Sequence, residues 1–205
     1  MAELTFQHIY HPPQHGSKRT ILVLHGTGGD EKSLLPIAEV LDPAAGALSV
    51  RGKVLENGAP RFFRRLAEGV FDLEDLVFRT HELADFVSTA IETYQLDPKN
   101  IVAVGYSNGA NIAASIFLHR PEVLSAGVLL RAMVPVEPAD QLDLSEKHIL
   151  ISEGRFDPIV PIDNAERLAQ MFRERGANVQ LNWQDLDHRL ARTEIDAARN
   201  WLGQA

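Results

Sequence analysis

The chain has 205 residues, of which 45% are hydrophobic and 23% charged, and its formal net charge is −8. These values are ordinary for a globular protein, so we expect one domain over residues 1–205. The acidic balance argues against nucleic acid as a partner, and no apolar run reaches the roughly 20 residues of a membrane span. With no cysteine, disulfides, thiolate metal sites and a cysteine nucleophile are excluded. The N-terminus has no secretory pattern, which favours a cytoplasmic location.

The first part of the chain predicts strands at residues 4–10, 20–26 and 46–50. The second of these, TILVLHG, is a continuous apolar run, which is typical of a parallel strand buried on both faces. Asp30 follows it and is expected to cap a helix. Residues 51–79 show no sustained period, and because long loops in compact domains are usually functional, we expect this segment to roof a pocket.

From Thr80 onward the alternation of elements is clear. Helical spacing of apolar residues predicts a helix that ends before the Asp-Pro pair at 97–98, and the capping-box spacing of Asp163 and Glu166 predicts another. The remaining expected elements are strands at 100–105, 125–130, 147–152 and 178–183 and helices at 108–119 and 192–203. This order predicts an α/β fold with a mostly parallel central sheet flanked by helices.

Ligands of such sheets bind beyond the carboxyl ends of the strands, so the loops that follow strands deserve inspection. GYSNG, residues 105–109, matches the G-x-S-x-G pattern between a predicted strand and a predicted helix. Small residues at Gly105 and Gly109 permit a sharp turn that turns Ser107 outward at a helix N-terminus, where the helix dipole favours negative charge. The alternative is a glycine turn with a solvated serine. We interpret Ser107 as a nucleophile.

A serine nucleophile needs a base and a carboxylate that orients the base, and in this fold the carboxylate precedes the histidine in the chain. Asp157 follows a predicted strand and is the favoured carboxylate. Its rivals are Glu153, next to the strand end, and Asp163, which is better explained as a helix cap. An Asp-Pro turn without a catalytic role is the structural alternative.

His188 is the only histidine after Asp157 and lies in a loop between the last predicted strand and the last helix. The earlier His119 and His148 fall on a helix end and a strand start, so both are interpreted as structural. A loop histidine is more often solvated than catalytic, but the position of all three members after strands favours His188 as the base.

The tetrahedral intermediate also needs donors for its oxyanion. The backbone N–H of Asn108 is one candidate, with its side chain not required, and the backbone N–H of Thr27 in the loop HGTGGD is the other. A simple turn out of the strand at His25 and Gly26 is the structural alternative. No cofactor is expected, and we expect no metal site. The cluster of His8, His11 and His15 lacks a nearby carboxylate and is interrupted by prolines.

These motifs resemble the α/β-hydrolase superfamily, and more narrowly the phospholipase/carboxylesterase group of small bacterial esterases. The chain is similar to the hydroquinone-induced hydrolases of Gram-positive bacteria and to a copper-inducible relative. The residues that carry the resemblance are LHGTGG (24–29), SVRG (49–52), VLENGAPRFFRRLAEGVFDLEDL (54–76), GYSNGANIAAS (105–115), DPIVP (157–161) and DH (187–188). The resemblance implies a compact hydrolase of small carboxylic esters without a large cap domain. It implies Ser107, Asp157 and His188 as the triad, with Thr27 and Asn108 at the oxyanion.

Within the predicted roof, Phe62 and Phe63 are candidates to line an apolar acyl or aryl site, and Arg51, Arg64 or Arg65 to meet a substrate carboxylate. The equally favoured alternative is that the phenylalanines fill the core and the arginines are solvated.

The chain departs from its relatives at Asp187, where they usually carry glycine. If the backbone there needs a positive φ, aspartate tolerates it at some cost, and its carboxylate would favour the imidazolium of His188. On that interpretation Asp187→Gly shifts the acid limb of the pH–rate profile downward.

Three alternatives stay open. A thioesterase or lysophospholipase would use the same fold and triad. A dienelactone hydrolase is less favoured, because those proteins carry cysteine at the position of Ser107. A binding protein that has lost catalysis belongs to another class, although it would usually lack a triad member. A homodimer is also left open.

Overall fold

The computed structural model describes residues 3–138 and 142–204. Among these residues, seven strands form one sheet in the order β1-β3-β2-β8-β9-β10-β11. Only the β1–β3 pair is antiparallel; the other neighbours are parallel. The strands are β1 (His8–His11), β2 (Thr20–Leu24), β3 (Gly46–Val50), β8 (Ile101–Tyr106), β9 (Ala126–Leu130), β10 (His148–Gly154) and β11 (Asn178–Gln184).

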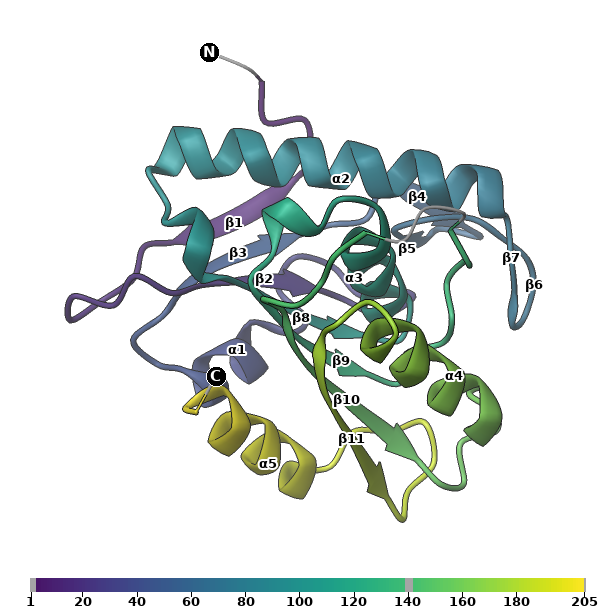
Figure 1. Cartoon of the computed structure of the whole chain (residues 1–205). Helices are drawn as coiled ribbons and strands as arrows, with labels where there is room; N and C mark the ends of the chain where they lie inside the picture. Colours follow the sequence, from purple (N-terminus) through teal and green to yellow (C-terminus); the bar gives the residue numbers. More distant parts are fainter. Residues whose placement is uncertain (1–2, 139–141, 205) are drawn as a thin grey trace.

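Helices cover both faces of the sheet, as Figure 1 shows. They are α1 (Leu35–Leu41), α2 (Leu73–Tyr94), α3 (Asn108–His119), α4 (Ile162–Arg173) and α5 (Arg192–Leu202), with short 3-10 turns at Pro98–Asn100 and Pro121–Val123. One hydrophobic core lies between the sheet and α2, α3 and α4. A second core lies on the opposite face, under α1 and α5. The α/β-hydrolase architecture expected from the sequence, without a cap domain, is therefore confirmed.

The segment 51–79 is more regular than expected. It contains two small hairpins and the first residues of α2. The hairpins are β4 (Val54–Glu56) with β5 (Ala59–Arg61), and β6 (Arg65–Ala67) with β7 (Val70–Phe71). Helix α2 begins at Leu73, because the Asp72 carboxylate caps it by accepting a hydrogen bond from the Asp75 N–H. Periodicity missed this start because Leu73 and Phe78 are more than half exposed and blur the apolar stripe.

Two predicted helix caps are wrong. Asp30 lies in a turn upstream of α1, where its carboxylate accepts hydrogen bonds from the Lys32 N–H and the Ser33 hydroxyl. Local bonds of this kind satisfy an aspartate without a helix. Asp163 lies inside the first turn of α4, because Pro161 occupies the N-cap position. The strand at 46–50 and the helix at 108–119 have the predicted bounds.

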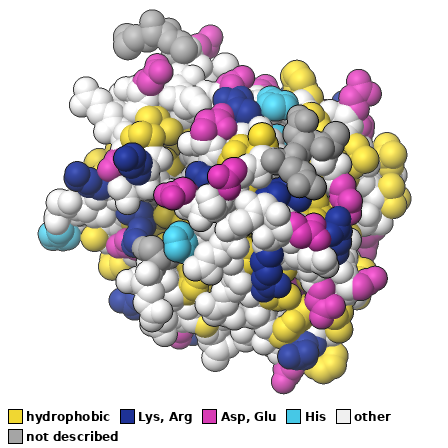
Figure 2. Space-filling model, in the orientation of Figure 1, with side chains coloured by type: hydrophobic (Ala, Val, Ile, Leu, Met, Phe, Trp, Pro, Cys, Tyr) yellow, Lys and Arg dark blue, Asp and Glu magenta, His cyan; other side chains and the backbone are white. Residues whose placement is uncertain are grey.

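Figure 2 shows acidic and basic side chains interspersed on one face of the molecule. The ion pairs of the protein include that of Arg167 with Glu137. In the described part of the chain, no helix combines the length and the apolar character needed to cross a membrane.

Candidate active site

The turn after β8 places Ser107 at the centre of the sheet edge. Ser107 has φ 51° and ψ −114°, a conformation that residues other than glycine rarely adopt. Its N–H donates to the carbonyl of Leu130 at the end of β9. The turn is crowded: a Cβ on Gly109 would overlap the carbonyl of Leu24, and one on Gly105 would lie 2.6 Å from the carbonyl oxygen of Gly109. The two glycines therefore permit the close packing that turns Ser107 outward.

Ser107, His188 and Asp157 form one hydrogen-bonded chain. His188 Nε2 lies 3.0 Å from Ser107 Oγ, and His188 Nδ1 lies 2.7 Å from Asp157 Oδ2. Because a carboxylate only accepts, Nδ1 carries the proton of a neutral imidazole and Nε2 is free to accept from the serine hydroxyl. The structure thus brings together all three predicted residues in the order of contacts that nucleophilic serine catalysis requires.

Asp157 is held rigidly. Its side chain is fully buried, and its second oxygen, Oδ1, accepts hydrogen bonds from the backbone N–H groups of Ile159 and Val160 at 2.8 and 3.2 Å. The rival Glu153 forms no hydrogen bond or ion pair with His188 in the described part of the chain. It is buried instead beside Ala132, whose N–H it accepts at 2.7 Å, and burial raises its pKa well above the usual range.

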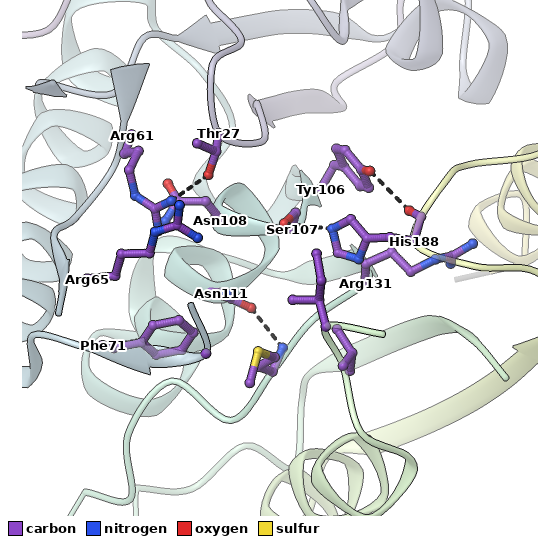
Figure 3. A pocket seen from close by; sticks show the side chains of 14 residues that line it. Thr27, Arg61, Arg65, Phe71, Tyr106, Ser107, Asn108, Asn111, Arg131 and His188 are labelled. Atoms are coloured by element: carbon purple, nitrogen blue, oxygen red, sulfur yellow. Dashed lines mark hydrogen bonds between the residues drawn. The ribbon is translucent and has the colours of Figure 1, made fainter. Parts of the chain in front are cut away.

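A cavity of about 250 Å3 opens beside Ser107. Figure 3 shows Arg61 and Arg65 on one side of it and His188 and Arg131 on the other. The lining residues are Thr27, Arg61, Arg65, Gly69, Phe71, Tyr106, Ser107, Asn108, Asn111, Arg131, Met133, Ile159, Val160 and His188.

The two predicted oxyanion donors, Thr27 and Asn108, both line this cavity. Within the described residues, neither backbone N–H donates a hydrogen bond: Asn108 is the first residue of α3, where an N–H has no partner within the helix. The loop of Thr27 is fixed by the buried His25, whose Nε2 accepts from the Gly52 N–H and whose Nδ1–H donates to the Gly26 carbonyl. Burial lowers the pKa of His25, so the neutral imidazole is favoured.

The side chain of Asn108 has a role that the sequence did not suggest. Its Oδ1 accepts a hydrogen bond from the backbone N–H of Phe62 at 2.7 Å. Its Nδ2 is buried and has no partner among the described residues. The amide therefore connects the serine turn to the hairpin segment.

The two phenylalanines predicted to line the pocket lie outside it. Phe62 and Phe63 belong to the core, with 2% and 0% exposure, and neither lines the cavity. Their rings pack on neighbouring rings inside the protein, Phe62 on His25 and Phe63 on Phe71. From this segment, Phe71 is the phenylalanine that reaches the cavity.

The predicted arginines divide in the same way. Arg51 lies outside the cavity and pairs with Glu31, and Arg64 is exposed and pairs with Asp72. Arg65 lines the cavity and holds Glu56 through two nitrogens.

Sequence reasoning missed Arg61. Its guanidinium is buried, lines the cavity and donates to the Thr27 hydroxyl at 2.7 Å, and burial lowers its pKa. No periodic pattern marks a short hairpin strand, so no sequence signal points to this residue.

Sequence reasoning also missed Arg131 and Tyr106. Both lie at the carboxyl end of a buried strand, the position that identified Ser107 and Asp157. A charged residue placed directly after the apolar run of β9 was the signal that could have found Arg131.

Two features were expected of Asp187: a backbone that needs a positive φ and a carboxylate whose charge acts on His188. Its backbone lies outside the positive-φ region, so no glycine is needed there. Its carboxylate pairs with the exposed Arg189, whose hydrogen bonds lower the pKa of Asp187. The negative charge beside His188 is therefore largely compensated.

The residues described provide no cluster of three or more His, Asp or Glu side chains that would hold a metal ion. In the N-terminal histidine cluster, both ring nitrogens of His8 have hydrogen-bond partners. They lie 2.7 Å from the Phe6 carbonyl oxygen and from the Tyr94 hydroxyl.

Comparison with known proteins places the chain among hydrolases. The sequence model of the dienelactone hydrolase family matches residues 9–199. The protein named "Putative hydrolase MhqD" from Bacillus subtilis (strain 168) is 45% identical over 97% of this chain and 98% of its own. The crystal structure of the Bacillus cereus carboxylesterase is 46% identical, has a TM-score of 0.95 and is matched over 98% of this chain and 94% of its own. The structure of YahD with malic acid is 32% identical, with a TM-score of 0.91, over 98% and 99% of the two chains.

Proposed function

This chain belongs to the dienelactone hydrolase family of the α/β-hydrolase superfamily and is an esterase-type hydrolase, and we propose that it cleaves small carboxylic esters through an acyl-enzyme on Ser107. From the sequence alone a dienelactone hydrolase is less favoured, because Ser107 stands where those proteins carry cysteine, yet the model of that family matches residues 9–199 of this chain. The observation that carries the proposal is the chain of contacts at 3.0 and 2.7 Å from Ser107 through His188 to Asp157.

In the proposed first half-reaction, the Ser107 hydroxyl gives its proton to His188 Nε2 as Oγ attacks the ester carbonyl carbon. Asp157 stabilises the resulting imidazolium through the Nδ1–H bond. The imidazolium then protonates the leaving alcohol oxygen as the carbon–oxygen bond breaks. A water molecule attacks the acyl-enzyme by the same proton route in reverse, which releases the acid and restores Ser107.

The backbone N–H groups of Thr27 and Asn108 stabilise the tetrahedral oxyanion in this proposal. Their support is that both residues line the cavity beside Ser107 and that neither donor has a partner among residues 3–138 and 142–204. Donors held in place before the reaction are worth about 10²–10³-fold in kcat for each one removed. The hairpins of residues 51–79, which contribute four lining residues, form the roof over this site.

The proposal is tested with 4-nitrophenyl acetate. Ser107→Ala is expected to lower kcat/KM by about 10⁴-fold or more, and Asp157→Asn by about 10⁴-fold, because the base loses its nucleophile or its orientation. Mass spectrometry of quenched native protein should find an acetyl group on the peptide that contains Ser107. A Ser107→Ala protein that hydrolyses the ester like the native one would refute the proposed nucleophile and favour a ligand-binding role.

A carboxylate on the substrate is supported by a separate observation. Arg61 Nε lies 3.2 Å from the Phe63 carbonyl oxygen and Nη1 bonds to Thr27, while Nη2 has no hydrogen-bond partner among the described residues. Arg61 and Arg65 share Glu56 as ion-pair partner, and Glu68 also acts on Arg65, so of the two arginines Arg61 is the less compensated at this side of the cavity. The related YahD structure was obtained with malic acid, a dicarboxylic acid.

We therefore propose esters that carry a free carboxylate as the preferred substrates. Arg61→Met is expected to lower kcat/KM for 4-nitrophenyl hydrogen glutarate by about tenfold to a hundredfold, in line with a lost charge-assisted hydrogen bond, with a smaller effect on 4-nitrophenyl acetate. Arg64→Met is the matched control, because Arg64 is exposed and outside the cavity. Equal losses on both esters would exclude Arg61 as the carboxylate-binding group.

A further inference from the structure

The loop that carries His188 is held by side chains from two other strands. Tyr106, the last residue of β8, donates its hydroxyl to the carbonyl of His188 itself at 3.0 Å. Arg131 Nε donates to the carbonyl of Asp187 at 3.1 Å, and Arg131 Nη2 donates to the carbonyl of Arg189 at 2.7 Å. Three consecutive carbonyls are thus fixed by side chains that come from the ends of β8 and β9, and Figure 3 shows Arg131 next to His188.

Arg131 is itself fixed from the opposite side. Nη1 donates to the Ser152 carbonyl at 3.0 Å and to Glu194 Oε2 at 2.8 Å, and Nη2 donates to Glu194 Oε1 at 3.0 Å. Together with the two bonds to the loop, all five N–H groups of the guanidinium are used. Both side chains of the pair are fully buried.

Glu194 completes the connection to helix α5. Its carboxylate also accepts from the Ser152 hydroxyl at 2.9 Å and from the Ala191 N–H at 2.7 Å, at the start of the helix. The loop from 187 to 191 is therefore bound to one buried ion pair through residues 187, 189 and 191.

We infer that Arg131 is a positioning residue for the proposed reaction, which orients His188 between Ser107 and Asp157 by binding the carbonyls on both sides of it. This inference rests on the proposed role of His188. A planar guanidinium is suited to this task because its donors have fixed directions, whereas a lysine ammonium would satisfy only some of these acceptors. A displacement of about 1 Å in a reacting group costs about 10²-fold in rate.

The Arg131–Glu194 ion pair also affects the charge around His188. Facing the imidazole are the carboxylate of Asp157, the Tyr106 ring and Arg131, whose Nε lies 3.9 Å from Asp157 Oδ2. Behind these lie Glu194 and the buried Glu153, and on the loop itself lies the Asp187–Arg189 pair. Because Glu194 neutralises Arg131, removing only the Glu194 charge leaves a cation near His188 and disfavours the imidazolium.

Three variants separate geometry from charge, with kcat/KM for 4-nitrophenyl acetate measured from pH 5 to 9. Arg131→Lys keeps the positive charge but loses part of the hydrogen bonds of the guanidinium. We therefore expect kcat/KM to fall by about 10²-fold, with the acid limb of the pH–rate profile unmoved. The double variant Arg131→Met/Glu194→Gln removes both charges and should show a similar loss, again with the limb unmoved. Glu194→Gln keeps the guanidinium, so its rate should fall less, and its acid limb should move to lower pH.

Arg19→Met is the matched control. Arg19 pairs with Asp42 and directly precedes β2, so it lies at the amino ends of the strands, away from the site, and the variant should match the native enzyme. Thermal melting verifies that each variant is folded, and Arg131→Lys is the decisive variant because it leaves no buried charge unpaired. A folded Arg131→Lys enzyme with native kcat/KM, or a Glu194→Gln enzyme with an unmoved acid limb, would overturn the inference. Ser107→Ala is assayed in parallel: if it stays active, the proposed reaction fails rather than the role of Arg131.

Discussion

The side chain of Asn108 joins the serine turn to the hairpin segment of residues 51–79, because its Oδ1 accepts a 2.7 Å hydrogen bond from the backbone N–H of Phe62. Both residues are 2% exposed, so this bond is shielded from water. The interaction fixes the distance between the proposed oxyanion donor at 108 and the hairpin that carries Arg61.

Asn108→Ala should therefore impair the enzyme, although the proposed oxyanion donor is only the backbone N–H. The change leaves the Phe62 N–H buried without an acceptor, which costs about 1–3 kcal/mol of the free energy of unfolding. We expect kcat/KM to fall by about tenfold as the hairpin segment loosens. Denaturant unfolding and ester hydrolysis measure the two effects. Asn200→Ala, on the exposed surface of α5, is the control, and equal behaviour of the two variants would contradict the role of the Asn108 side chain.

Arg189→Ala tests the charge of Asp187. At present the two side chains form a pair with contacts of 2.9 to 3.0 Å on the surface, with Arg189 86% exposed. Removing the arginine exposes His188 to the negative charge of Asp187, which favours the imidazolium and should move the acid limb of the pH–rate profile upward. Because exposed charges interact weakly through water, the expected shift is a fraction of a pH unit and is largest at low salt.

Asp187→Asn, by contrast, should leave the acid limb nearly unmoved, since the native carboxylate is already compensated. The shift in Arg189→Ala should vanish in the double variant Arg189→Ala/Asp187→Asn and shrink at high salt. A large downward shift in Asp187→Asn alone would show instead that Asp187 acts on His188 directly.

Glu153→Gln tests the buried carboxyl that does not touch the imidazole. Burial raises the pKa of Glu153, so the folded protein retains a proton that the unfolded chain releases above about pH 4.3. The free energy of unfolding of the native protein then falls as pH rises, by up to about 1.4 kcal/mol per pH unit, until the folded-state pKa is reached. Glutamine does not titrate, so the variant should lose less stability between pH 5 and pH 8.

Urea unfolding at the two pH values provides the measurement, and Glu122→Gln, at an exposed carboxylate, is the control. If the native protein and Glu153→Gln lose equal stability between pH 5 and pH 8, Glu153 is ionised in the folded state.

Thr27→Val distinguishes the role of the Thr27 backbone N–H from that of its side-chain hydroxyl. The isosteric change keeps the backbone N–H that we propose for the oxyanion but removes the hydroxyl that accepts from Arg61. We expect kcat for 4-nitrophenyl acetate to stay within about threefold of the native value, and kcat/KM for the glutarate ester to fall by about tenfold, because Arg61 loses an anchor. A hundredfold loss of kcat on the acetate ester would show that the loop backbone has moved.

The sequence predicted the parts of this molecule that depend on strong local signals. Helix 108–119 is apolar almost all round, and the Gly105 and Gly109 pair flanks Ser107, so both the element and the turn were recognisable. Asp157 and His188 were found because parallel strands bring their carboxyl ends to one edge.

The pocket was harder to predict because burial inside a short hairpin leaves no period. Phe62 and Phe63 are as apolar as Phe71, and nothing local distinguishes the two that enter the core from the one that reaches the cavity. Arg51, Arg61 and Arg65 pose the same difficulty, since each pairs with a carboxylate whose position depends on the tertiary fold.

The backbone of Ser107 has a consequence for how this protein can change over generations. Its left-handed conformation costs a serine on the order of 1–3 kcal/mol and costs a glycine little. Ser107→Gly should therefore yield a protein that melts at a higher temperature but lacks the proposed nucleophile. On that proposal, a copy of the gene released from selection for hydrolysis can lose activity and gain folding stability in the same step.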